Sequence, residues 1–173
     1  MSPLFDTPSG RPQPSPSPEK YWLPMIGWQI FGHPTFAEEA ISESRSVSRF
    51  FCLVRRASKL SGRPWRKVLW FLKRERGTLN DHQHFHFCMG GLGESADLTF
   101  ICHALEEEWE NKGGGICRIE PYRQDLHGVF YNLKKRRRSS SPFPVSSKFI
   151  WDHNEVMISD SVWPHLRRRF PAV

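Results

Sequence analysis

Histidines alternate with aromatic residues in one short run of this chain, from His82 to Phe87. Successive side chains of an extended strand point to opposite faces of a sheet, so His82, His84 and His86 would share one face and Phe85 and Phe87 the other. Buried neutral imidazoles need hydrogen-bond partners, and they are also common metal ligands. The run therefore predicts a strand with one face that packs in the core and a histidine face that binds a metal ion.

A carboxylate on the preceding predicted strand would complete this site. His84 and His86 would supply two nitrogen ligands, and Glu75 a carboxylate from the other strand of the same hairpin. His82 is an alternative third ligand, a group that supports the ligands, or an exposed residue at the turn. A mixed imidazole and carboxylate site with open positions suits Mg²⁺ or Mn²⁺, and Mn²⁺ is the better match to imidazole.

Tyr131 lies on a short basic segment that the sequence predicts as a helix, and it is a candidate nucleophile. Its hydroxyl has an ordinary pKa of about 10, so it needs a nearby metal ion and cation before it can attack. Lys134 follows it by three residues and His127 precedes it by four, so a helix would place all three on one side. Lys134 would stabilise phosphate charge and His127 would be an accessory group. The alternative is that Tyr131 only packs on an amphipathic helix.

The same segment continues with four basic residues, Lys135, Arg136, Arg137 and Arg138. Beside a nucleophile they would contact phosphates, although a solvated helix end or a nuclear localisation signal has the same composition. The chain as a whole has 25 Lys and Arg against 18 Asp and Glu, a formal net charge of +7. This charge favours a polyanionic partner, with nucleic acid first and an anionic membrane surface second.

The composition indicates one domain behind an N-terminal arm. Residues 1–20 are rich in Pro and Ser and are predicted to be disordered, and residues 21–173 are long enough to form one core. The four cysteines have no C-x-x-C spacing, which indicates reduced thiols and an intracellular protein, in the cytoplasm or, in a eukaryotic host, in the nucleus. No stretch has the pattern of a signal peptide or a membrane span, so we expect no membrane partner.

Two long helices and several short strands must position these residues. Thr35 and Glu38 have the spacing of a capping box, so the first helix should begin there and extend to Leu60. Apolar residues at helical spacing predict a second helix from Ser95 to Asn111. The other predicted elements are strands at Met25–Phe31, Trp65–Arg76, His82–Gly90, Ile116–Arg123 and Phe149–Ile158, a turn at Gly77–Asp81, and helices at Gly128–Arg138 and Trp163–Phe170.

This order predicts an α+β fold of ferredoxin-like type. Its βαββαβ pattern suits an antiparallel sheet with helices on one face and an open catalytic face on the other, followed by a C-terminal extension.

Three motifs resemble those of the HUH endonuclease superfamily, and within it the single-tyrosine rolling-circle replication initiator (Rep) proteins. The segment Trp28–Phe36 resembles the first-strand motif that ends in a Thr-Phe pair. His84 and His86 resemble the histidine-hydrophobic-histidine metal motif, and Tyr131 with Lys134 resembles the Tyr-x-x-Lys nucleophile motif. The motifs follow one another in the family's order.

The resemblance implies a specific reaction and specific partners. It implies nicking and joining of single-stranded DNA through a 5′-phosphotyrosine and a free 3′-OH, which initiates rolling-circle replication. It also implies Glu75 as the third metal ligand, single-stranded or hairpin DNA at a replication origin as the substrate, and a host helicase and polymerase as partners.

The chain departs from the family in several places. It has no G-x-x-x-x-G-K-[ST] loop, so the helicase domain of many viral Reps is missing, and Lys135 stands where several of them have Asp. Pro34 replaces the usual hydroxyl or aliphatic residue before the Thr-Phe pair. Three alternatives stay open: a single-tyrosine transposase of the same superfamily, a non-catalytic ferredoxin-like nucleic-acid-binding module, and a structural metal-binding domain.

Overall fold

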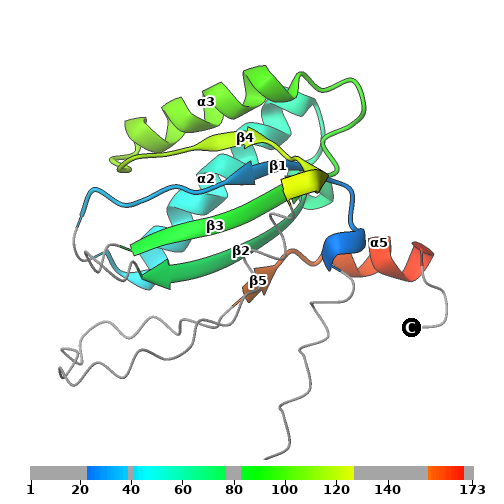
Figure 1. Cartoon of the computed structure of the whole chain (residues 1–173), viewed down its shortest axis with the longest axis horizontal. Helices are drawn as coiled ribbons and strands as arrows, with labels where there is room; N and C mark the ends of the chain where they lie inside the picture. The colour runs from blue at the N-terminus through cyan, green and yellow to red at the C-terminus, as the bar shows by residue number, and fades with distance from the viewer. Residues whose placement is uncertain (1–22, 39–40, 77–82, 127–155, 170–173) are drawn as a thin grey trace, which may run out of the picture.

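The computed structural model describes residues 23–38, 41–76, 83–126 and 156–169, and these form an α+β fold with one five-stranded sheet (Figure 1). The sheet order is β4-β1-β3-β2-β5, and each neighbouring pair is antiparallel. The strands are β1 (Trp28–Gly32), β2 (Leu69–Arg76), β3 (Gln83–Gly90), β4 (Ile119–Pro121) and β5 (Val156–Ile158). The helices are α2 (Glu43–Ser61), α3 (Leu98–Asn111) and α5 (Val162–Arg169), with 3₁₀ turns η1 (Leu23–Met25), η2 (Trp65–Lys67) and η3 (Gln124–Leu126).

The two long helices pack against one face of the sheet. Phe85, Phe87 and Met89 of β3 are all fully buried in the core that this face shares with α2 and α3. Trp109 of α3 and Phe50 of α2 add large aromatic rings to the same core. Burial of such side chains is the main favourable term in folding. The alternation predicted for β3 is therefore confirmed on its apolar side.

The first long helix begins later than the capping-box pattern predicts. Its N-cap is Ser42, whose side chain accepts a hydrogen bond from the backbone N–H of Arg45. Its C-cap is Gly62, whose left-handed backbone (φ 65°) favours glycine. The predicted end near Leu60 is confirmed, and the predicted start at Thr35 is wrong.

Thr35 and Phe36 stay extended because tertiary contacts hold them there. Thr35 forms a bridge with His84 and Phe36 forms one with Gly114. The Phe36 ring is buried against Trp109 in the core. Long-range burial of an aromatic ring outweighs a local capping preference worth about 1 kcal/mol.

Several other elements are shorter than predicted. α3 begins after Asp97, which caps the N–H of Phe100, rather than at Ser95. The segment Trp65–Lys67 is the 3₁₀ turn η2, so β2 begins at Leu69, and β4 covers Ile119–Pro121 rather than Ile116–Arg123. The arm at residues 1–20, the turn at Gly77–Asp81, the helix at Gly128–Arg138 and most of the strand at Phe149–Ile158 lie outside the described residues.

The second face of the sheet is partly covered, which corrects the expectation of an open face. Leu23 of η1 and Val162 and Leu166 of α5 form a second apolar cluster with Phe71 and Cys88 of the sheet. The indole N–H of Trp28 donates to the Leu23 carbonyl, 2.8 Å away, and anchors η1. The predicted C-terminal extension thus contributes an edge strand, β5, and a covering helix, α5 (Figure 1). None of the helices that the structure describes has the length and hydrophobicity of a transmembrane segment.

Candidate metal centre

Polar residues from β2 and β3 face one another at the end of the second face that η1 and α5 leave uncovered. His84 lies opposite Glu75, and His86 lies opposite Lys73, across the antiparallel pair β2–β3. Directly opposed residues of neighbouring strands point to the same face of a sheet. These four side chains therefore gather on the side away from the two long helices.

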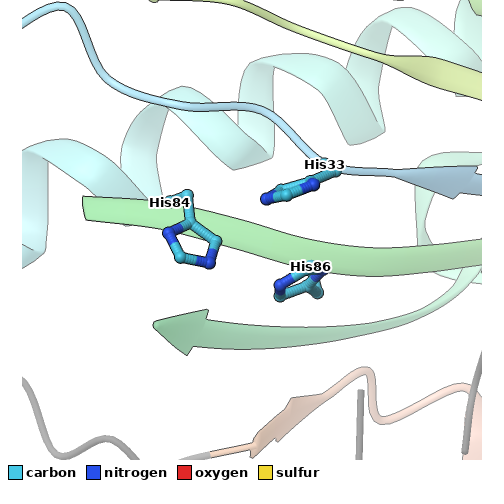
Figure 2. A group of neighbouring side chains, drawn as sticks. All are labelled: His33, His84 and His86. Carbon is cyan, nitrogen blue, oxygen red and sulfur yellow. The ribbon is translucent and has the colours of Figure 1, made fainter. Parts of the chain in front are cut away.

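A third histidine joins them from the chain that follows β1. Gly32 pairs with Phe87, and Thr35 pairs with His84 in the same alignment, so His33 falls opposite His86. Figure 2 shows the imidazoles of His33, His84 and His86 close together on one side of the sheet. The rings of His33 and His86 are stacked, with centroids 4.2 Å apart and an interplanar angle of 27°.

Glu75 is the anionic centre of this group. Its Oε2 lies 3.2 Å from Nε2 of His86 and 3.5 Å from Nε2 of His84, and its Oε1 binds the ammonium of Lys73. Burial alone would raise the pKa of Glu75, but hydrogen bonds from the two histidines and Lys73 outweigh it and hold this pKa well below its ordinary value. Glu75 is therefore a carboxylate at any physiological pH.

The separations around Glu75 match those between ligands of one metal ion. Two ligand atoms that each lie about 2.1 Å from an ion are about 3.0 Å apart in octahedral geometry and about 3.4 Å apart in tetrahedral geometry. The two Glu75–histidine distances fall close to this range. The same distances also suit direct hydrogen bonds, so the carboxylate orients both imidazoles with or without an ion.

His33 and His86 are available as ligands because burial disfavours their charged forms. Burial and the neighbouring histidines lower the pKa of His33 to about 4, despite the attraction of Glu75. Burial also lowers the pKa of His86, although Glu75 opposes this shift. A neutral imidazole offers a nitrogen lone pair to a metal ion, so these two rings need lose no proton to bind one near pH 7.

The group is open to solvent from one side. The side chains of His84 and Glu75 are 13% and 22% exposed, whereas His86 lies beneath them at 3%. Phe31 of β1 is half-buried beside the group, with its ring centroid 6.5 Å from that of His86. His84 and Glu75 are therefore accessible from solvent, while the sheet encloses His86.

The structure brings together three of the residues that the sequence singles out, namely His84, His86 and Glu75. The remaining candidates, Tyr131, Lys134, His82, His127, Lys135, Arg136, Arg137 and Arg138, lie outside the described residues.

Sequence reasoning missed His33. It lies in the first motif, one residue after β1 ends, but only the register of β1 with β3 places it opposite His86. The sequence did contain a hint, because His33 follows a predicted strand and a second predicted strand carries several histidines. The chain matches no family model, no curated protein and no solved structure with which it was compared.

Proposed function

We propose that this chain is a single-tyrosine HUH-type endonuclease that nicks and joins single-stranded DNA to initiate rolling-circle replication. The observation that carries the proposal is the meeting of His84, His86 and Glu75 on one sheet face, where Oε2 of Glu75 lies 3.5 Å and 3.2 Å from the Nε2 atoms of His84 and His86. A hydrophobic residue, Phe85, separates the two histidines in sequence and anchors their strand in the core.

The arrangement of the sheet supports this assignment. The elements from β1 to β4 follow one another as β1, α2, β2, β3, α3 and β4, and their strands stand in the order β4-β1-β3-β2 with antiparallel neighbours. We propose that this part is a ferredoxin-like domain, with β5 and α5 as its extension. In such a sheet β1 and β3 are central, and the three histidines belong to this region: His84 and His86 lie on β3, and His33 directly follows β1.

In the proposed reaction, His84, His86 and Glu75 would hold Mg²⁺ or Mn²⁺. The ion, when bound, would neutralise charge on the scissile phosphate. Tyr131 would attack the phosphorus, so that an O–P bond to the tyrosine forms as the bond to the 3′ oxygen breaks; the tyrosine would lose its hydroxyl proton to solvent, and the 3′ oxygen would take one up. The products are a 5′-phosphotyrosine and a free 3′-OH, and attack by such a hydroxyl reverses the step. Lys134 would stabilise the phosphate charge during both steps.

The covalent chain is long enough for Tyr131 to reach this group. The backbone N–H of Tyr122 donates to the carbonyl of Gln29, 2.8 Å away, which fixes Tyr122 beside β1. His33 lies four residues further along the chain from Gln29, about 13 Å at strand spacing. Of the nine steps from Tyr122 to Tyr131, three fall in η3 at about 2 Å each, and the other six reach up to about 20 Å when extended, so a span of up to about 26 Å permits the encounter.

A covalent-adduct assay tests the proposal. Incubation with a mixed pool of labelled single-stranded DNA and Mn²⁺ should give a protein–DNA adduct on a denaturing gel. Tyr131→Phe and EDTA should each abolish the adduct, and Tyr122→Phe, the matched control, should retain it. An adduct that survives in Tyr131→Phe would contradict the assignment of the nucleophile.

A non-catalytic nucleic-acid-binding module is the second candidate. Phe31 and Tyr122 are half-buried aromatic residues on the second face of the sheet, beside the apolar cluster, where unpaired bases could stack on them. Binding of single-stranded DNA without any adduct, across varied sequences and hairpins, would favour this module over the nuclease.

A further inference from the structure

We infer that His33 is a fourth protein ligand of the metal centre, which then presents three imidazole nitrogens and one carboxylate oxygen and selects transition-metal ions over Mg²⁺. The inference rests on the metal site of the proposed function, but it does not require the nuclease reaction. It concerns which ion the folded chain binds and through which residues.

The position of His33 is the first argument. The ligand atoms of His33, His84 and His86 all lie within 4.8 Å of one another. This limit exceeds the separation of about 3.4 Å between ligands of a tetrahedral ion, so binding requires the rings to draw together. His33 follows the end of β1 and is partly exposed, so rotation of its side chain can provide this adjustment, whereas His86 is enclosed by the sheet.

The backbone around His33 is held by hydrogen bonds on both sides, so rotation of the side chain alone would bring the ring to the ion. The N–H of His33 donates to the carbonyl of Arg118 at 2.8 Å, and the carbonyl of Pro34 accepts from the N–H of Phe85 at 2.9 Å. These bonds tie the backbone of His33 and Pro34 to the residue before β4 on one side and to β3 on the other. A preorganised ligand loses less conformational entropy when the ion binds.

Lys73 limits Glu75 to one ligand atom. The Lys73 side chain is 7% exposed and its ammonium binds Oε1, which leaves Oε2 as the oxygen that faces the histidines. The carboxylate would therefore bind in a monodentate way, and the protein would supply four donor atoms in total. A small coordination number with mostly nitrogen donors is unlike the oxygen-rich octahedral sphere that Mg²⁺ requires.

The types of donor atom at the site determine which metal ions it binds most tightly. Imidazole suits Zn²⁺, Ni²⁺ and related ions, and the affinity of nitrogen sites rises from Mn²⁺ through Co²⁺ towards Cu²⁺. A site with two imidazoles and one carboxylate suits Mg²⁺ or Mn²⁺. A third imidazole shifts the preference to Mn²⁺, Co²⁺ and Zn²⁺.

Co²⁺ binding to the full chain tests the inference directly. Titration of the metal-free protein should give one equivalent of bound Co²⁺, with the intense visible absorption of a four- or five-coordinate ion. No sulfur-to-metal absorption should appear, because the proposed ligands include no cysteine. Calorimetry should show Co²⁺ bound at least a hundredfold more tightly than Mg²⁺.

Two variants isolate His33. His33→Ala removes the ring, and His33→Phe keeps a ring to stack on His86 but removes the nitrogens. Both should weaken Co²⁺ at least tenfold and reduce the visible absorption, and His103→Ala, an exposed histidine on α3, should change neither. Wild-type Co²⁺ affinity and spectrum in the folded His33→Phe protein would overturn the inference, as would equal affinity of the wild type for Mg²⁺ and Co²⁺.

The outcome is separable from the proposed function. If no DNA adduct forms under any condition but Co²⁺ binds as expected, the nuclease function is excluded and the four-ligand site is still supported. Normal adduct formation, together with a Co²⁺ affinity that the His33 substitutions do not change, would support the nuclease and exclude His33 as a ligand.

Discussion

Lys73 binds one oxygen of Glu75 and leaves the other turned toward the histidines of β3. Both side chains are largely buried, and a buried ammonium without its anion is strongly unfavourable. The ion pair therefore orients a candidate ligand and also contributes to the stability of the sheet.

Glu75→Ala should reduce the free energy of unfolding by about 2–4 kcal/mol, because Lys73 loses its carboxylate while it stays buried. Lys73→Met combined with Glu75→Ala should recover most of this loss, since an apolar side chain needs no ionic partner. Urea unfolding of the two single variants and the double variant measures the coupling. A double variant no more stable than Glu75→Ala would show that the ion pair does not stabilise the sheet.

His84→Ala and His86→Ala should differ in stability but not in metal binding. Each removes one ligand, so both should abolish metal-dependent cleavage. His86 is almost fully enclosed, so its replacement should also cost about 1–3 kcal/mol through lost packing, whereas the more exposed His84 should cost less than about 1 kcal/mol. Thermal melts in EDTA measure stability, and Co²⁺ titrations measure binding. Full metal-dependent activity in either variant would contradict the proposed site.

Gly32→Ala should disturb the site without touching a ligand. A Cβ at Gly32 would lie 2.2 Å from the ring of Phe87, which is fully buried and cannot move away. Overpacking of this kind should cost about 1–3 kcal/mol and shift His33, the next residue. Gly27→Ala is the matched control, because nothing lies within 4 Å of its Cβ. If Gly32→Ala melts at the same temperature as Gly27→Ala, the close packing of β1 on Phe87 is wrong.

The metal-free protein should lose stability as the pH falls from about 6.5 to about 4. Burial lowers the pKa of His33 to about 4, so in this range the unfolded chain binds a proton that folded His33 does not. Burial also lowers the pKa of His86, so this residue likewise makes the folded protein less stable as the pH falls. The pKa of Glu75 is lowered as well, so its contribution is lost only below about 4.5, the ordinary value for a glutamate. His33→Phe should flatten the upper part of this dependence in thermal melts with EDTA, and an unchanged slope would contradict the prediction.

Lys134→Ala should slow adduct formation by about 10²–10³-fold, as expected for loss of one group that stabilises transition-state charge. The covalent product should still form at long times, because Tyr131 remains. Single-turnover rates measured beside Lys112→Ala, a control on the C-terminal side of α3, would show whether the effect is specific. Equal rates for the two variants would exclude a role for Lys134.

Local patterns in the sequence predicted the parts of the fold that depend on near neighbours. The two-residue alternation of β3 correctly placed Phe85 and Phe87 in the core and His84 and His86 on the other face. The apolar spacing of α3 predicted its end at Asn111. In both cases burial of one face follows directly from the periodicity of the element.

Features that depend on contacts between residues far apart in the sequence could not be predicted from local patterns. The start of the first helix was wrong because Phe36 packs on Trp109, far along the chain, instead of entering a helix. His33 was missed as a candidate because only the β1–β3 register, which pairs residues far apart in the sequence, places it beside His86. The covering of the second sheet face by α5 likewise requires the tertiary structure, since no local signal shows where Val162 and Leu166 pack.

The pairing of β5 with β2 has a consequence for the kinetics of the proposed reaction. The segment that carries Tyr131 begins after η3 and ends at β5, so the folded domain holds it at both ends. If Tyr131 is the nucleophile, its attachment at both ends would give it a high effective concentration near the sheet before DNA binds. After cleavage the same attachment would keep the linked 5′ end close to the site, so that rejoining to a nearby 3′-OH would be an intramolecular event. Cutting the chain within residues 127–155 should therefore slow strand joining more than strand binding.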